Sequence, residues 1–134
     1  QGLASIVSTT GNPDGHLVLR GGNSGTNYDS QSVLNVSRQL SEAGLMNKVM
    51  VDCSHGNSNK DYRRQKDVLR SVAQQVKEGS KSIMGVMIES HLVEGNQKLS
   101  SDPAAITYGQ SITDACIDIQ TTELLLEELA ISVR

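Results

Sequence analysis

Four charged or metal-binding side chains each follow a short apolar segment of this sequence. They are Arg20 after LVL, His55 after VMVDCS, Glu89 after IMGVMI and Asp114 within SITDAC. Arginine holds phosphate and carboxylate groups through its planar guanidinium, and histidine with carboxylates suits a divalent transition metal. In an α/β barrel such residues gather at the carboxyl ends of the strands, however far apart they lie in sequence. We therefore predict that the four residues share one site.

Each of these residues also has an explanation that involves no function. Arg20, followed by two glycines, could lie in a turn and form a surface ion pair. His55 could be a solvated loop histidine, and Glu89 could form a structural ion pair because a carboxylate at the edge of a dry core needs a partner. Asp114 could simply cap the helix that follows. The combination of one histidine and two carboxylates at successive strand ends favours the metal site.

Other polar residues near these positions carry weaker signals. Cys53, two residues before His55, could join the ligands as a thiolate, although a small buried hydrophobic residue is the favoured interpretation. His91 and Glu94 are expected to support the site or to be exposed. The basic segment 62–66 begins a predicted helix, where cations oppose the helix dipole. It could attract an anionic partner, but a solvated helix face is favoured.

The apolar patterns predict strands alternating with helices. Strands are expected at residues 16–20, 48–52 and 82–89, and their ends at Arg20, Asp52 and Glu89 are 32 and 37 residues apart. Helices are expected from apolar residues spaced by three and four: Val33, Val36 and Leu40; Val68, Leu69, Val72, Ala73 and Val76; Leu125, Leu126, Leu129, Ala130 and Val133. This repetition is typical of an α/β fold with a parallel sheet.

The segments between these elements lead to three further expectations. Gly44 and Gly79 should end the first two helices. Thr121 should cap the last helix, after a long loop that runs from Glu89 to Asp114. Residues 1–10, with apolar Leu3, Ala4, Ile6 and Val7, should form a helix that precedes the first strand.

Length and composition exclude several classes of protein. The chain has 134 residues, whereas a complete (β/α)8 barrel needs about 200 to 250, so a barrel could be present only in part. The net charge is −3, without a long basic run, which argues against nucleic acid or an anionic membrane as partner. Cys53 and Cys116 show no metal-type spacing, and no signal peptide or membrane-spanning stretch is visible. A soluble, cytoplasmic protein is expected.

Five longer motifs resemble one known family. GNPDGHLVLRGG, NYDSQSV, VDCSHGNSNKD, GVMIESHLVEGNQ and YGQSITDACI are similar to segments of class I 3-deoxy-D-arabino-heptulosonate 7-phosphate (DAHP) synthases, and the resemblance runs from Gln1 to about Arg134. It implies a (β/α)8 TIM barrel, of which this chain would be the C-terminal half. Residues 1–134 would then form a single partial domain that contains the last three βα units.

The resemblance also implies roles for the four residues. His55, Glu89 and Asp114 match ligands of a divalent metal of the Mn, Fe, Co or Zn class, and Arg20 matches an arginine that binds phosphoenolpyruvate. The family joins phosphoenolpyruvate to erythrose 4-phosphate, giving DAHP and phosphate in the first step of the shikimate pathway. Its fourth metal ligand is a cysteine in a Gly-Pro-Cys segment that this chain lacks, and neither Cys53 nor Cys116 matches it.

The sequence is compatible with three functional interpretations. The chain could be the C-terminal portion of a DAHP synthase, active once the rest of the barrel is present and expected to form a homo-oligomer. Alternatively, it could be a non-catalytic half-barrel that keeps a partial metal site and associates with the missing half through open sheet edges. A different phosphoenolpyruvate-using barrel aldolase is disfavoured by SITDAC and VEGNQ. A departure at Asp118 and Ile119, where the family usually has Gly-Trp, leaves only the start of the last helix in doubt.

Overall fold

Three parallel strands form the sheet of the computed structural model, which describes residues 2 and 4–133. They are β1 (Leu17–Leu19), β2 (Val49–Asp52) and β3 (Ile83–Met87), in the order β1-β2-β3. The register places Leu19 beside Val51 and Asp52 beside Met87, so the three strands end at one edge. The predicted α/β class and the parallel sheet are confirmed.

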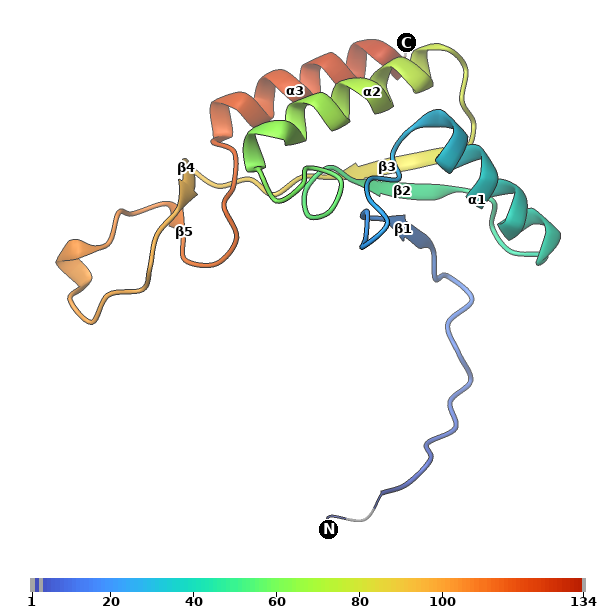
Figure 1. Cartoon of the computed structure of the whole chain (residues 1–134), viewed down its shortest axis with the longest axis horizontal. Coiled ribbons are helices and arrows are strands. Elements are labelled where there is room, and N and C mark those ends of the chain that lie inside the picture. Colours follow the sequence, from blue (N-terminus) through green and yellow to red (C-terminus); the bar gives the residue numbers. More distant parts are fainter. Residues whose placement is uncertain (1, 3, 134) are drawn as a thin grey trace.

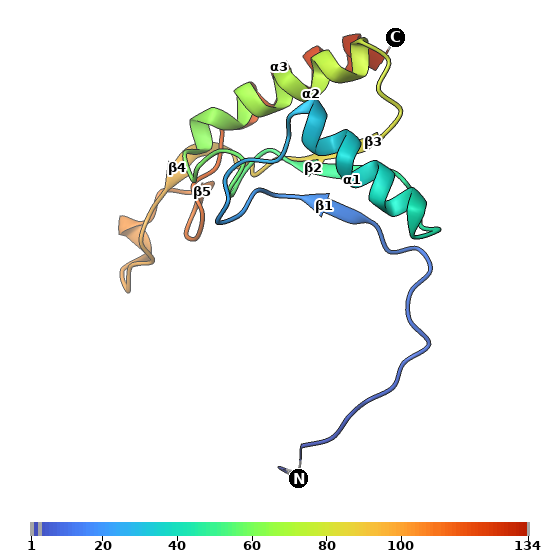
Figure 2. The same cartoon turned by 45° about the vertical axis from the view of Figure 1, so that its right-hand side comes forward.

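Three helices lie on one side of this sheet (Figures 1 and 2). They are α1 (Ser30–Glu42), α2 (Gln65–Lys77) and α3 (Ile119–Val133). Helix α1 follows β1, α2 follows β2, and α3 lies along α2 (Figure 1). The described residues form no closed barrel: their sheet is open, and its second face is not covered by any helix in Figure 1. None of the described helices is long and apolar enough to cross a membrane.

The core lies between the sheet and the helices. It contains Leu19, Val33, Val49, Val51, Cys53, Val68, Leu69, Val72, Ile117 and Leu125, all nearly inaccessible to solvent. Burial of each such aliphatic side chain stabilises the fold by roughly 1.5–3 kcal/mol. The two helical stripes predicted around Val33 and Val68 therefore face the sheet, as their spacing requires.

Two predictions near the chain ends are wrong. Residues 4–10 form no helix: they are exposed and extended, while Gln1 and Leu3 lie outside the described residues. The apolar side chain of Ile6 has nothing to pack against and is fully exposed, so helical spacing gains no burial there. Helix α3 begins at Ile119 rather than after Thr121, because Asp118 Oδ1 accepts the backbone N–H of Thr121 at 2.7 Å and acts as the cap.

The long loop predicted between Glu89 and Asp114 contains regular structure. Strand β4 (Val93–Asn96) pairs in parallel with β5 (Gln110–Ser111), and a single 3-10 turn, η2 (Pro103–Ala105), lies between them. The Gln97 side chain donates to Thr107 O at 2.7 Å and accepts from Thr107 N at 2.8 Å. These strands are short and largely exposed, so their apolar pattern is too weak to predict them. A second 3-10 turn, η1 (Tyr62–Arg64), precedes α2, so the basic segment spans a turn as well as the helix start.

Candidate metal centre

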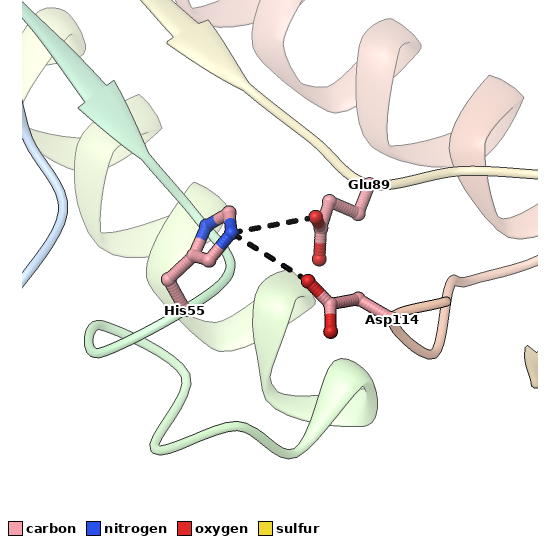
Figure 3. A group of neighbouring side chains, drawn as sticks. All are labelled: His55, Glu89 and Asp114. Carbon is pink, nitrogen blue, oxygen red and sulfur yellow. Dashed lines mark ion pairs between the residues drawn. The ribbon is translucent and has the colours of Figure 1, made fainter. Parts of the chain in front are cut away.

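Three of the four predicted site residues meet beyond the carboxyl ends of the strands. One ligand atom each of His55, Glu89 and Asp114 lies within 4.8 Å of the others. His55 Nε2 is 3.5 Å from Glu89 Oε1 and 3.9 Å from Asp114 Oδ2, and both carboxylates point toward that nitrogen (Figure 3). The structure thus brings together side chains separated by up to 59 positions in the sequence.

The ring of His55 is oriented by Asp52 at the end of β2. Asp52 Oδ2 lies 2.7 Å from His55 Nδ1, and the Asp52 residue is only 1% exposed. A histidine whose Nδ1 proton is bonded to a carboxylate presents Nε2 to a metal, which is the nitrogen that faces Glu89 and Asp114. From the sequence, Asp52 was predicted only as the end of a strand. The signal it missed was a carboxylate three residues before a candidate ligand histidine.

The loop after β2 is held in an unusual backbone conformation. His55, Asn59 and Lys60 have positive φ angles of 48°, 53° and 61°, a region that residues with a side chain enter at an energetic cost. Within the loop, Lys60 N donates to His55 O at 2.9 Å. The buried Asn57 side chain donates to Leu19 O at 3.0 Å and to Asp52 O at 2.8 Å, which ties the loop to β1 and β2.

Arg20 is brought beside this loop by a contact between two glycines. A Cβ added to Gly21 would lie 2.6 Å from the backbone carbon of Gly56. The two backbone segments can therefore cross this closely only because both residues lack a side chain. Asn57 N also donates to Arg20 O, at 3.2 Å. Arg20 and the three candidate ligands line one cavity of about 290 Å³. Its other lining residues are Ser54, Lys60, Tyr62 and Ala115.

Lys60 and Tyr62 were not predicted as part of the site. They reach the cavity because the chain reverses at the end of the loop and places the start of η1 beside it. The cavity therefore combines two cationic side chains, Arg20 and Lys60, with the three candidate ligands. That composition suits an anionic, phosphate- or carboxylate-bearing molecule next to a metal ion.

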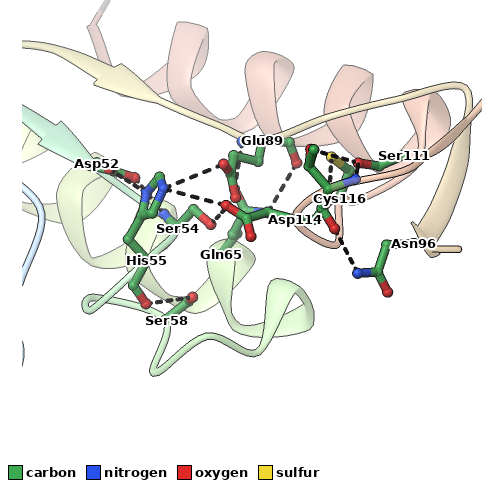
Figure 4. A network of polar contacts seen from close by, with 11 residues as sticks. Asp52, Ser54, His55, Ser58, Gln65, Glu89, Asn96, Ser111, Asp114 and Cys116 are labelled. Atoms are coloured by element: carbon green, nitrogen blue, oxygen red, sulfur yellow. Dashed lines mark hydrogen bonds and ion pairs between the residues drawn. The ribbon is translucent and has the colours of Figure 1, made fainter. Parts of the chain in front are cut away.

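Glu89 is held through its side chain and its backbone (Figure 4). Ser54 Oγ donates to Glu89 Oε2 at 2.6 Å, which leaves Oε1 as the oxygen that faces His55. The Gln65 side chain makes two further hydrogen bonds to the Glu89 backbone, at 2.8 Å and 3.0 Å. By contrast, neither His91 nor Glu94 belongs to the ligand cluster among the described residues, and His91 Nδ1 accepts from the adjacent Leu92 N.

The two cysteines are not suited to metal ligation in this arrangement. Cys53 is fully buried in the core, where burial, reinforced by the charge of Asp52, raises the pKa of its thiol to about 12. The favoured interpretation of Cys53 as a small hydrophobic residue agrees with this burial. Burial also raises the pKa of Cys116, whose Sγ lies 3.5 Å from Asp114 O. Both are free thiols.

The donor set fits a divalent transition metal. Ligand atoms bound to one ion at about 2.0–2.2 Å are themselves roughly 3–4 Å apart. The two distances from His55 Nε2, 3.5 Å and 3.9 Å, agree with this spacing, and all three ligand atoms lie within 4.8 Å of one another. One imidazole nitrogen with two carboxylate oxygens suits Zn, Mn, Fe or Co rather than a soft, all-sulfur site. An α/β protein with such a cluster at its strand ends is, by class, a candidate metal-dependent enzyme.

Comparisons with known proteins assign this class to a family. The model of the DAHP synthetase I family matches residues 2–127. The Tyr-sensitive phospho-2-dehydro-3-deoxyheptonate aldolase of Escherichia coli is 49% identical over 128 residues, and the phospho-2-dehydro-3-deoxyheptonate aldolase of Haemophilus influenzae is 52% identical over 132 residues. The aligned regions cover 96% and 98% of this chain, but 36% of each relative.

A solved structure supports the same conclusion. Phospho-2-dehydro-3-deoxyheptonate aldolase from Francisella tularensis is 48% identical, with a TM-score of 0.87 over 96% of this chain and 37% of that one. The chain belongs to the DAHP synthetase I family. It spans little more than a third of the length of these relatives and corresponds to a C-terminal portion, so its open sheet is part of a (β/α)8 barrel.

Proposed function

We propose that the protein containing these residues condenses phosphoenolpyruvate with erythrose 4-phosphate to give DAHP and phosphate, the first step of the shikimate pathway. Family membership supports the reaction class. The single observation that supports a chemical role for this segment is the convergence of His55, Glu89 and Asp114. We expect residues 1–134 alone to be inactive, because they span little more than a third of the length of these relatives.

The proposed cofactor is a divalent metal ion of the Mn, Fe, Co or Zn class. His55, Glu89 and Asp114 would hold it, and when bound it would supply Lewis-acid polarisation of the erythrose 4-phosphate aldehyde. Asp52 would keep the Nδ1 proton of His55 in place and so leave Nε2 free to bind. Ser54 would hold Glu89 Oε2 and so aim Oε1 into the site.

Arg20 is the proposed phosphoenolpyruvate-binding residue of this segment. Its guanidinium lines the same cavity as the ligands, and Lys60 adds a second positive charge there. These cations would neutralise the phosphate and carboxylate of phosphoenolpyruvate and orient its reactive carbon toward the aldehyde. The close crossing of Gly21 and Gly56 would keep the phosphoenolpyruvate site in a fixed position relative to the metal site.

We further propose that residues 1–134 act as a single partial domain, the last three βα units of the barrel. Within the described residues β1 and β3 each pair only with β2, which leaves both edges of the sheet free, and an exposed edge favours pairing with further strands. The expected partner is the remaining barrel half, or further copies of the chain in a homo-oligomer. The two free thiols fit the proposed cytoplasmic location, since reducing compartments keep cysteines unpaired.

The second candidate function is a non-catalytic half-barrel, and its supporting observation is the same open sheet. The two candidate functions predict different results in one assay, which measures phosphate release from phosphoenolpyruvate in the presence of erythrose 4-phosphate and Mn²⁺. We expect release by the natural full-length polypeptide that contains these residues, no release by residues 1–134 alone, and no release by a full-length His55→Ala control. Release by the 134 residues alone would refute the need for the other half, and inactivity of the unaltered natural polypeptide would refute the proposed reaction.

A further inference from the structure

The side chain of Gln65 makes two hydrogen bonds to the backbone of one residue, Glu89. Gln65 Oε1 accepts the backbone N–H of Glu89 at 2.8 Å, and Gln65 Nε2 donates to the carbonyl of the same residue at 3.0 Å. The residue is 0% exposed and opens helix α2, 24 positions before Glu89 in the sequence. One primary amide therefore satisfies both backbone groups of a candidate metal ligand (Figure 4).

This pair of bonds occurs where the sheet can no longer hold Glu89. The paired part of β2 ends at Asp52, opposite Met87, and the last bond from that side runs from Cys53 N to Met87 O at 2.9 Å. Beyond it the chain turns away into the loop that carries His55. A backbone N–H that leaves a ladder in a buried region must find another acceptor, and the amide of Gln65 takes the place that a neighbouring strand would occupy.

The backbone bonds act together with those of the Glu89 side chain. Ser54 Oγ fixes Oε2 at 2.6 Å, and Ile117 N donates to Glu89 O at 3.1 Å from the other side. With backbone and carboxylate both bonded, Oε1 has little freedom to turn away from His55 Nε2. Groups that orient a metal ligand through hydrogen bonds typically change metal affinity 10–100-fold when they are removed.

We propose that Gln65 is a positioning residue, which fixes the backbone of Glu89 so that its Oε1 faces the metal ion. This inference rests on the proposed function, because it takes Glu89 as a ligand. Gln65 is not among the residues that line the candidate metal cavity, so its removal would weaken metal binding through Glu89.

The chain offers a matched control on the same helix. Gln75 is also buried, at 8% exposure, and donates through Nε2 to a backbone carbonyl, that of Tyr28, at 2.8 Å. Tyr28 is not among the residues that line the candidate metal cavity. Methionine has a side chain of similar length to glutamine but no amide, so either replacement removes the hydrogen bonds of the amide. Only the replacement at Gln65 removes bonds to a residue of the metal site.

The experiment measures Mn²⁺ affinity of the natural full-length polypeptide by calorimetry, far below the unfolding temperature of each variant. We expect Gln65→Met to weaken Mn²⁺ binding about 10-fold, and to speed hydrogen exchange of the Glu89 amide in the metal-free protein. Gln75→Met should leave Mn²⁺ affinity unchanged while lowering the unfolding temperature. Equal Mn²⁺ affinity in Gln65→Met and the unaltered protein would overturn the inference and leave the metal site intact.

A measurement on the unaltered protein keeps the test decisive if Gln65→Met does not fold. With ¹⁵N-labelled glutamine, titration with diamagnetic Zn²⁺ should shift the side-chain amide signals of Gln65 and leave those of Gln75 in place. Zn²⁺ binding without a shift at Gln65 would overturn the positioning role. Failure of the unaltered protein to bind Mn²⁺ or Zn²⁺ would instead overturn the proposed metal site, and this inference with it.

Discussion

The two sides of the candidate metal site are built differently. On one side, His55 and Glu89 are held by buried partners, since Asp52, Ser54 and Gln65 are all at most 4% exposed. On the other side, the Asp114 side chain is 73% exposed, and His55 is its ion-pair partner in the described part of the chain. The first side is a rigid framework at the strand ends, whereas the second is a carboxylate on a surface loop.

This difference indicates how the site would bind a metal. Ligands fixed in advance lose little conformational entropy on binding, whereas a mobile ligand must be ordered at that moment. We expect His55 and Glu89 to set the position of the ion and Asp114 to close onto it.

Removing either rigid ligand should have the largest effect. We expect His55→Ala or Glu89→Ala in the natural full-length polypeptide to abolish metal-dependent turnover and leave the circular dichroism spectrum unchanged, because both side chains lie outside the core cluster. Asp114→Ala should weaken metal binding less than Glu89→Ala. Metal content by mass spectrometry provides the measurement, and His91→Ala is the control. Full metal content in both rigid-side variants would contradict the ligand assignment.

A glycine exchange should break the framework itself. Gly21→Ala forces a Cβ to within 2.6 Å of the Gly56 backbone at a φ of 70°, whereas Gly44→Ala has the same strain, at a φ of 69°, with open space around it. The left-handed conformation alone costs about 1–2 kcal/mol for a residue with a side chain. Gly21→Ala should therefore lower the urea midpoint clearly more than Gly44→Ala, and equal midpoints would show that the crossing is not tight.

Asp52→Asn should give a smaller, local effect. An amide oxygen carries no full charge, so it accepts the Nδ1–H of His55 more weakly than a carboxylate does. The tautomer with the proton on Nδ1 is then less strongly favoured, and we expect metal affinity to fall about 10–100-fold. The ¹⁵N shifts of the His55 ring in the metal-free protein report the tautomer directly. Asp102→Asn makes the same exchange at a cap in a remote loop, where an oxygen remains to accept Ala104 N, and is the control. An unchanged His55 tautomer would show that Asp52 does not orient the ring.

The ion pair between α2 and α3 should have the smallest effect. Arg70 lies 2.8 Å from Glu128 and lowers the pKa of that carboxyl group. A lowered pKa in the folded state means that the stabilisation is present above the unfolded pKa and is lost as pH falls through the folded value. Both side chains are substantially exposed, so Glu128→Gln should change stability by less than about 1 kcal/mol at pH 7 and by nothing once the carboxyl is protonated. The urea midpoints of Glu128→Gln and the unaltered protein are compared at pH 7 and at a pH low enough to protonate the carboxyl group. An equal difference between the two proteins at both pH values would contradict the ionic origin.

Much of the framework could be predicted from the sequence because its signals are local. Apolar runs that end at Arg20, Asp52 and Glu89 gave the three strands, and the stripes around Val33 and Val68 gave the first two helices. Their spacing implied a parallel sheet, and parallel strands place their carboxyl ends together. The prediction that Arg20 and the three ligands share one cavity followed from that geometry, although their roles in binding remain predictions.

The errors came from segments whose structure depends on distant contacts. Residues 4–10 have helical spacing but no surface to pack on, and β4 with β5 is stabilised by side chains such as Gln97 rather than by an apolar pattern. Spacing reports only what a segment could bury, not whether a partner exists.

The sequence by itself determined the family, the alternation of strands and helices, and the residues able to bind a metal or an anion. The tertiary structure alone decided which buried groups orient those residues: Asp52 behind His55, and Ser54 and Gln65 around Glu89. The reason is physical. A ligand's chemistry resides in its own side chain, whereas its direction depends on hydrogen bonds from residues that become neighbours only after the sheet and helices have packed.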